Sequence, residues 1–145
     1  MLTAVIVQDH AMVRDAFARL LASTARFQVI GCAGTIREAL LLVQGLAPDV
    51  IVADLPLEKG KAVGFLRALK RQGNRAPTLI LTEFEDGLFA SEVEGAGAAG
   101  CVSKERPTRE ILRAIDEALA GRKFAPAAGK RTAGSRATVT RRAGT

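Results

Sequence analysis

The chain contains no tryptophan and no tyrosine, so phenylalanine, present six times, is its only aromatic residue. A hydrophobic core must therefore be mainly aliphatic, and the hydrophobic share of 48% is sufficient to build one. No apolar run approaches the roughly 18 to 20 residues that a membrane-spanning helix needs. Residues 1–7 are too short for the core of a signal peptide and have no basic residues before them. We therefore expect one domain of ordinary size in the cytoplasm, without membrane association.

Cysteine and histidine are scarce as well. Cys32 and Cys101 are the two cysteines and His10 is the one histidine. In a cytoplasmic chain, two cysteines are usually small buried apolar residues, and His10 with two distant cysteines cannot complete a zinc site.

Acidic residues are absent after Glu117, while residues 122–145 hold seven of the 21 basic residues. Residues 1–121 are close to neutral, with 14 basic and 15 acidic side chains, so the net charge of +6 comes from the tail. The tail has almost no large apolar side chains and cannot offset its ordering entropy. We expect a domain over residues 1–121 and a flexible, solvated tail over residues 122–145, too short for a helix-turn-helix. The alternative role for the tail is a basic arm that makes weak, salt-sensitive contacts with nucleic acid or an acidic partner.

Five short apolar runs predict strands. They are continuous rather than alternating, as in parallel strands that are covered on both faces. The runs are Ala4–Val7, Gln28–Cys32, Val50–Ala53, Thr78–Leu81 and Ala99–Val102.

Amphipathic segments between these runs predict five helices. The second opens with a capping-box pattern, in which Thr35 and Glu38 satisfy each other's backbone amides. The last begins at Pro107, which suits a first helical position, and ends at Gly121. The segments are His10–Ser23, Thr35–Leu46, Val63–Arg71, Glu85–Glu94 and Pro107–Gly121.

This alternation predicts an α/β fold with a parallel sheet and helices on both faces. Ligands of such folds bind at the carboxyl ends of the strands. Asp9 and Asp54 follow the first and third runs, while Thr82 and Lys104 follow the fourth and fifth. Two carboxylates can hold Mg²⁺, a hydroxyl can donate to a phosphoryl oxygen, and an ammonium can attract an anion. Each of these residues by itself is more often a helix cap, a strand end or a solvated charge. Together, at the ends of four separate strands, they predict a phosphoryl-transfer site with a carboxylate nucleophile.

Four segments resemble the receiver domains of two-component response regulators, most closely those that precede a LuxR-type DNA-binding domain. The segments are Val5–His10 (VIVQDH), Asp49–Leu55 (DVIVADL), Leu79–Thr82 (LILT) and Gly97–Lys104 (GAAGCVSK). The resemblance implies a flavodoxin-like sheet of order 2-1-3-4-5, a phospho-aspartate switch at Asp54 and a partner sensor histidine kinase. It also implies a Mg²⁺ site at Asp9, Asp54 and the carbonyl of Pro56. The fourth helix, fifth strand and fifth helix would form the output face, with a homodimer through that face as an option.

Several positions depart from the family's pattern. Gln8 stands where a second acid is usual and supplies oxygen without charge, so the Mg²⁺ site should be weaker. Glu58 and Ala62 replace a proline and a glycine, and Cys101 replaces an aromatic residue. Glu83 replaces a small residue and should repel an incoming phosphoryl group. These departures leave open an alternative, a receiver that works as a phosphorylation-independent interaction or dimerisation module.

An enzyme or nucleotide-binding domain on the same fold is disfavoured. No glycine-rich loop follows the first strand, and His10 has no nucleophile beside it, which favours a structural role at the helix start. In the implied strand order Cys32 and Cys101 lie on opposite edges, roughly 19 Å apart, and a disulfide within the chain is not expected.

Overall fold

A computed structural model of the chain describes residues 1–54, 59–83 and 87–122. Pro56, Glu58, the start of the predicted helix at Glu85 and the tail beyond residue 122 lie outside the described residues. Nothing about their expected roles is tested by the structure.

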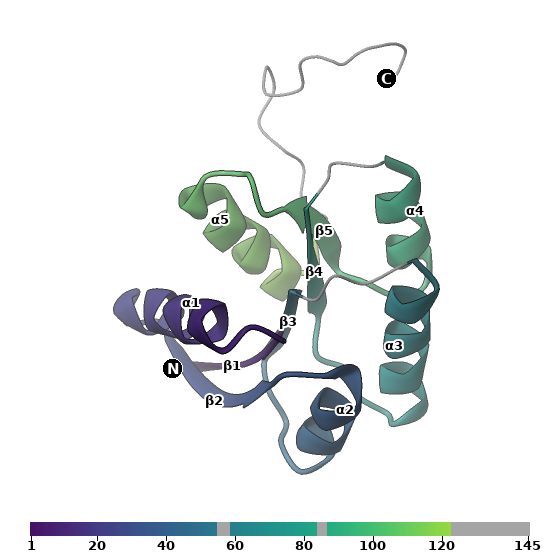
Figure 1. Cartoon of the computed structure of the whole chain (residues 1–145), viewed down its shortest axis with the longest axis horizontal. Coiled ribbons are helices and arrows are strands. Elements are labelled where there is room, and N and C mark those ends of the chain that lie inside the picture. The colour runs from purple at the N-terminus through teal and green to yellow at the C-terminus, as the bar shows by residue number, and fades with distance from the viewer. Residues whose placement is uncertain (55–58, 84–86, 123–145) are drawn as a thin grey trace.

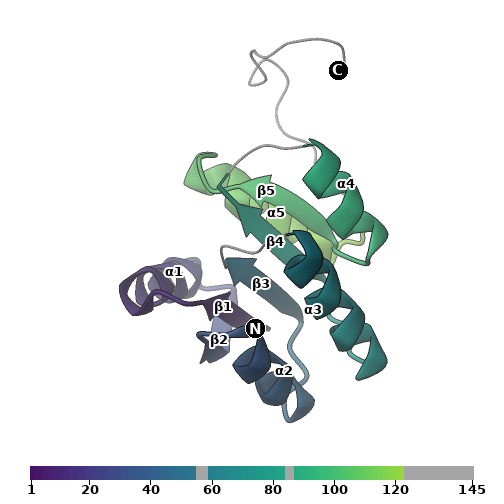
Figure 2. The same ribbon diagram turned by 45° about the vertical axis from the view of Figure 1, so that its right-hand side comes forward.

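A parallel sheet of five strands forms the centre of the fold, in the order β2-β1-β3-β4-β5. Figure 2 shows β3 between β1 and β4. The order confirms the flavodoxin-like topology that the resemblance implied. The strands are β1 (Leu2–Gln8), β2 (Phe27–Ala33), β3 (Val50–Asp54), β4 (Thr78–Thr82) and β5 (Gly100–Ser103).

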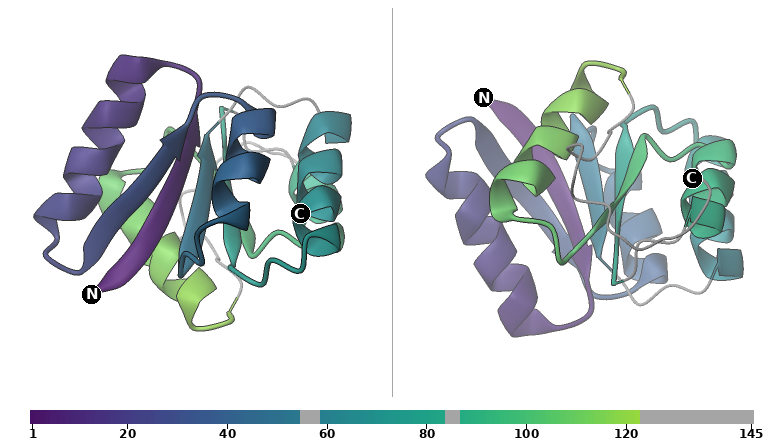
Figure 3. Two further views of the ribbon diagram at one scale, coloured as in Figure 1. Left: turned by 90° about the horizontal axis from the view of Figure 1, so that it is seen from below. Right: turned by 90° about the horizontal axis from the view of Figure 1, so that it is seen from above.

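The helices lie in two layers, with α1 and α5 on one face of the sheet and α2, α3 and α4 on the other (Figure 1 and Figure 3). This arrangement explains the continuous apolar strands, because alternate side chains enter opposite cores. Val5 and Ile51 pack on the side of α2 and α3, whereas Ile6 and Val52 pack on the side of α1 and α5. The helices are α1 (Ala11–Ser23), α2 (Ile36–Gln44), α3 (Lys59–Arg71), α4 (Gly87–Gly95) and α5 (Thr108–Leu119).

Some element ends differ from those predicted. Helix α3 begins at Lys59, four residues before the predicted start at Val63. The prediction was late because the first turn (Lys59-Gly60-Lys61) lacks the apolar spacing by which a helix is identified in a sequence. Pro107 is the residue that precedes α5, which begins one residue later than predicted. Gly121 follows the end of α5 with φ of +78°, a left-handed conformation that glycine adopts without steric cost.

The predicted capping box of α2 forms only in part. The Thr35 hydroxyl accepts a hydrogen bond from the Glu38 backbone N–H at 3.0 Å, as predicted. The Glu38 carboxylate instead accepts the N–H of Gly34 at 2.8 Å, one residue before the expected partner. The exchange still satisfies an amide at the entrance of the helix.

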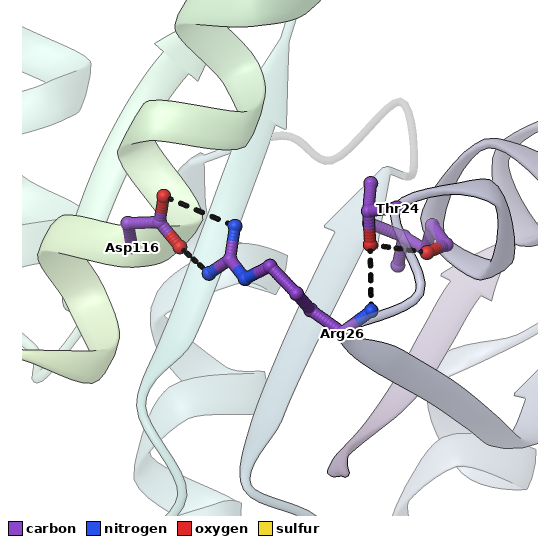
Figure 4. A network of polar contacts seen from close by, with 4 residues as sticks. Thr24, Arg26 and Asp116 are labelled. Atoms are coloured by element: carbon purple, nitrogen blue, oxygen red, sulfur yellow. Dashed lines mark hydrogen bonds and ion pairs between the residues drawn. The ribbon is translucent and has the colours of Figure 1, made fainter.

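An exposed ion pair between Arg26 and Asp116 joins the turn before β2 to helix α5 (Figure 4). The hydrogen bond to Asp116 raises the pKa of the Arg26 guanidinium, and the Asp116 charge adds to the effect. The same guanidinium lies 5.2 Å from the centre of the Phe27 ring. The pair therefore links the turn before β2 to α5 at the protein surface.

Cys32 and Cys101 are both free thiols and lie on the two edge strands, β2 and β5. The expectation that both are buried is wrong, because Cys32 is exposed and Cys101 is only partly buried at these edges. Their separation by three intervening strands agrees with the expectation that no disulfide joins them. Within the described residues, no helix combines the length and apolarity that crossing a bilayer requires.

Candidate functional site

The carboxyl ends of the parallel strands bring the predicted site residues to one rim of the sheet. Strand register places Gln8, the last residue of β1, directly beside Asp54, the last residue of β3. Thr82 ends β4 and pairs with Ser103 at the end of β5. Lys104 follows immediately, and its backbone N–H donates to the Thr82 carbonyl at 2.7 Å. The backbone therefore aligns four strand ends on one side.

Asp54 is the centre of this arrangement, and it is 8% exposed. Lys104 Nζ lies 2.9 Å from Asp54 Oδ1. The other oxygen, Oδ2, accepts a hydrogen bond from the Gln8 side-chain amide at 2.5 Å. Both oxygens of the carboxylate thus face a nitrogen, one charged and one neutral.

Gln8 is 4% exposed, and two contacts determine the orientation of its amide. The backbone N–H of His10 can only donate, so the Gln8 atom that it contacts at 2.9 Å must be the oxygen, Oε1. The remaining atom, Nε2, then faces Asp54, whose ionised carboxylate can only accept. Arg14 supports the same turn by donating to the Gln8 backbone carbonyl at 3.1 Å.

Lys104 lies between two carboxylates. Besides its contact with Asp54, its ammonium group lies 3.8 Å from Glu83 Oε2. The Asp54 side chain is 10% exposed and the Glu83 side chain 64% exposed, so the Asp54 pair is much less screened by solvent. Lys104 is therefore bound mainly to Asp54, with Glu83 as a weaker competitor.

The described contacts of Asp54 are with Gln8 and Lys104, and Asp9 and Thr82 lie at the same rim. Asp9 follows Gln8 and is exposed to solvent. Thr82 is partly buried at the end of β4. His10 precedes the first residue of α1 and gives it no side-chain cap, and its backbone N–H contacts the Gln8 side chain.

The donor set fits a divalent cation only in part. Among the described residues, Asp54 Oδ1 is buried and accepts no hydrogen bond, and the Lys104 ammonium lies beside it; such an oxygen is a suitable ligand for a hard cation. Asp9 is the other carboxylate that could hold the ion. Among residues 1–54, 59–83 and 87–122, however, no three His, Cys, Asp or Glu side chains gather closely enough to form a metal cluster. Gln8 turns its nitrogen, not its oxygen, toward Asp54.

Sequence reasoning missed two contacts. The Gln8–Asp54 hydrogen bond could have been found from the strand register, because the last residues of adjacent parallel strands are neighbours. The Glu83–Lys104 approach follows from the pairing of β4 with β5, which places the residues after both strands together.

Comparison with known proteins identifies relatives of this fold and rim. A sequence model of the family described as response regulator receiver domain matches residues 4–116. Response regulator GacA of Pseudomonas aeruginosa is 30% identical over 124 residues, which cover 86% of this chain and 58% of that protein. The DNA-binding transcriptional activator DevR/DosR of Mycobacterium tuberculosis is 33% identical over 117 residues, covering 81% of this chain and 54% of that protein. The chain thus spans little more than half the length of these curated relatives.

A solved structure supports the same comparison. The crystal structure of a LuxR-family two-component response regulator from Aurantimonas sp. SI85-9A1 matches with a TM-score of 0.80 and 31% identity. The match covers 87% of this chain and 91% of that one.

Proposed function

Because the chain belongs to the response regulator receiver domain family, we propose that it works as a phospho-aspartate switch with Asp54 as the phosphoacceptor. The observation that carries the proposal is the ion pair between Asp54 Oδ1 and Lys104 Nζ at 2.9 Å, at the carboxyl rim of the sheet. It places a nucleophilic carboxylate and a group that attracts phosphoryl oxygens side by side.

The proposed reaction forms a bond between a carboxylate oxygen of Asp54 and the phosphorus of a donor. With a phosphohistidine donor, the P–N bond breaks and the electron pair returns to the imidazole nitrogen. The phosphoryl group brings more negative charge to a rim that already holds Asp54, Asp9 and Glu83. Lys104 then faces a phosphoryl oxygen instead of the carboxylate, while the Thr82 hydroxyl is the proposed donor to another.

Receiver domains generally bind Mg²⁺ at their acidic site, and in this chain the proposed ligands are Asp9, Asp54 and the Pro56 carbonyl, with Gln8 beside them. A bound ion would neutralise charge on the transferring phosphoryl oxygens. Because Gln8 carries no charge where the family usually has a second acid, we propose that the ion binds weakly.

The proposed phosphoryl donor in the cell is a sensor histidine kinase, and the proposed place is the cytoplasm. The proposed unit is residues 1–121, with residues 122–145 as a basic tail that makes weak contacts with nucleic acid. Regulation of transcription is proposed from the DNA-binding transcriptional activator among the relatives, and homodimerisation from the resemblance to the receiver family. The family members are signalling proteins, which supports a switch rather than an enzyme with a diffusible substrate.

A second candidate is a receiver that binds its partner without phosphorylation. Two observations favour it: Gln8 engages one oxygen of Asp54, and Glu83 competes for Lys104. A partner complex or dimer that forms equally well with Asp54→Ala would support this candidate.

Phosphorylation with a small donor distinguishes the two functions. The chain is incubated with acetyl phosphate and MgCl₂, and intact mass is measured together with NMR spectra in beryllofluoride. We expect the mass of one added phosphoryl group, and both responses should be absent in Asp54→Ala. A folded chain without a mass shift, or with one that persists in Asp54→Ala, would contradict Asp54 as the phosphoacceptor.

A further inference from the structure

The Gln8 side chain satisfies Asp54 without a metal ion. In a chain with an acid at position 8, two carboxylates would face each other across β1 and β3 and repel, unless a cation or a proton intervened. Here the amide of Gln8 presents a donor to Asp54 Oδ2 at 2.5 Å, while Lys104 neutralises the charge at Oδ1. The carboxylate is therefore held by protein groups on both sides.

The amide cannot become a metal ligand by a simple rotation. A half-turn would direct Oε1 toward Asp54 and any cation, but it would also place the NH₂ group against the His10 N–H, donor against donor. The hydrogen bond at 2.9 Å between His10 and Oε1 would be lost, and a partly buried N–H left without this partner. In the orientation observed, a cation at Oδ2 would face the partially positive protons of the amide.

We propose that Gln8 is a positioning residue that takes the place of the metal at Asp54 Oδ2 in the resting chain, and that Mg²⁺ must displace its amide to reach this oxygen. The inference rests on the proposed function in that it concerns the same phosphoacceptor, yet it makes a separate claim about metal binding. The proposal and a role for Gln8 as an oxygen ligand predict opposite effects of removing Gln8 on Mg²⁺ affinity. Removing an oxygen ligand weakens Mg²⁺ binding, whereas removing a competitor strengthens it.

Magnesium titrations of the full chain without any phosphoryl donor decide between the two roles. The variants are Gln8→Ala, which removes the amide, and Gln8→Met, which keeps an unbranched side chain of similar shape and so protects the fold. Binding of MgCl₂ is measured by NMR titration and by calorimetry. We expect both variants to bind Mg²⁺ about tenfold more tightly than the unmodified chain.

Two controls locate the effect. Gln44→Ala makes the same substitution at an exposed residue at the far end of α2 and should leave Mg²⁺ affinity unchanged. In an Asp54→Asn background, Gln8→Ala should no longer change the Mg²⁺ affinity. Equal or weaker Mg²⁺ binding by folded Gln8→Ala and Gln8→Met, or an equal gain in Gln44→Ala, would overturn the proposal. Phosphorylation of Asp54 is measured separately, so either idea can fail while the other stands.

Discussion

The Glu83 carboxylate lies 3.8 Å from the Lys104 ammonium, the group that also neutralises Asp54. Glu83 occupies a position where receivers usually have a small residue, directly after Thr82. The two acids therefore share one cation, and both would repel a phosphoryl group that approaches Asp54.

Replacing Glu83 should accelerate phosphorylation. Glu83→Ala removes a like charge and leaves Lys104 to the phosphoryl group, but the Glu83 side chain is 64% exposed and its interaction is screened. An exposed pair contributes up to about 1 kcal/mol, so the rate of labelling by acetyl phosphate should rise by at most about fivefold, and less at high salt. Glu105→Ala, an equal charge change at an exposed neighbour, should give a smaller rise. A slower reaction in Glu83→Ala would contradict the competition.

Phe65 should be among the residues on which stability depends most. It lies on α3, is 1% exposed and packs against the sheet with Val5 and Ile51. Phe65→Ala should lower the free energy of unfolding by about 3–5 kcal/mol, since it removes buried apolar area and leaves a cavity. Urea denaturation followed by circular dichroism is suitable, because the chain has no tryptophan. Leu88→Ala, at a side chain that is 78% exposed, should change stability by less than about 0.5 kcal/mol.

Two glycines should respond to alanine with opposite signs. Gly64 lies inside α3, and an added Cβ would meet nothing within 4 Å. Gly64→Ala should stabilise the chain by about 0.4–1 kcal/mol, because alanine loses less backbone entropy in a helix. Gly97 has φ of +118°, where a side chain is strained, so Gly97→Ala should destabilise. If both substitutions shifted the midpoint of thermal unfolding equally and in the same direction, backbone conformation would not be the cause of the stability changes.

Cys32 should react slowly with thiol reagents at neutral pH. Cys32 is exposed on the edge strand, but partial desolvation by its neighbours raises the pKa of its thiol; nearby Arg14 lowers the pKa and Asp15 raises it. In a Cys101→Ala background, alkylation by iodoacetamide should therefore reach half its maximal rate at a pH above the roughly 8.5 of a free thiol. Because the folded chain favours the neutral thiol, this group's contribution to stability is complete below the pKa of the unfolded thiol and is lost as pH rises through the folded pKa.

The Cys32 prediction has an internal check. Asp15→Asn removes a charge that disfavours the thiolate, so the midpoint of alkylation should move to lower pH. A midpoint at or below that of free cysteine, measured on the folded chain, would contradict the raised pKa of the thiol.

Much of the site's placement was already determined by local sequence. Continuous apolar runs such as Val50–Ala53 can only be covered on both faces, and helices between such runs require parallel strands. Any polar residue that ends such a strand then lies at one rim. For that reason the sequence alone predicts Asp54 and Lys104 at the same rim, and in the structure Lys104 Nζ lies 2.9 Å from Asp54 Oδ1.

The tertiary structure alone decided how the polar groups at that rim pair with one another. The direction of the Gln8 amide depends on the register of β1 with β3 and on the position of the His10 backbone N–H. Neither can be derived from amino-acid composition or from the spacing of residues. The division of Lys104 between Asp54 and Glu83 likewise depends on distances and on solvent exposure. Apolar burial depends on pattern and can be read along the chain, whereas hydrogen bonds and ion pairs depend on direction and distance, which exist only once the strands are side by side.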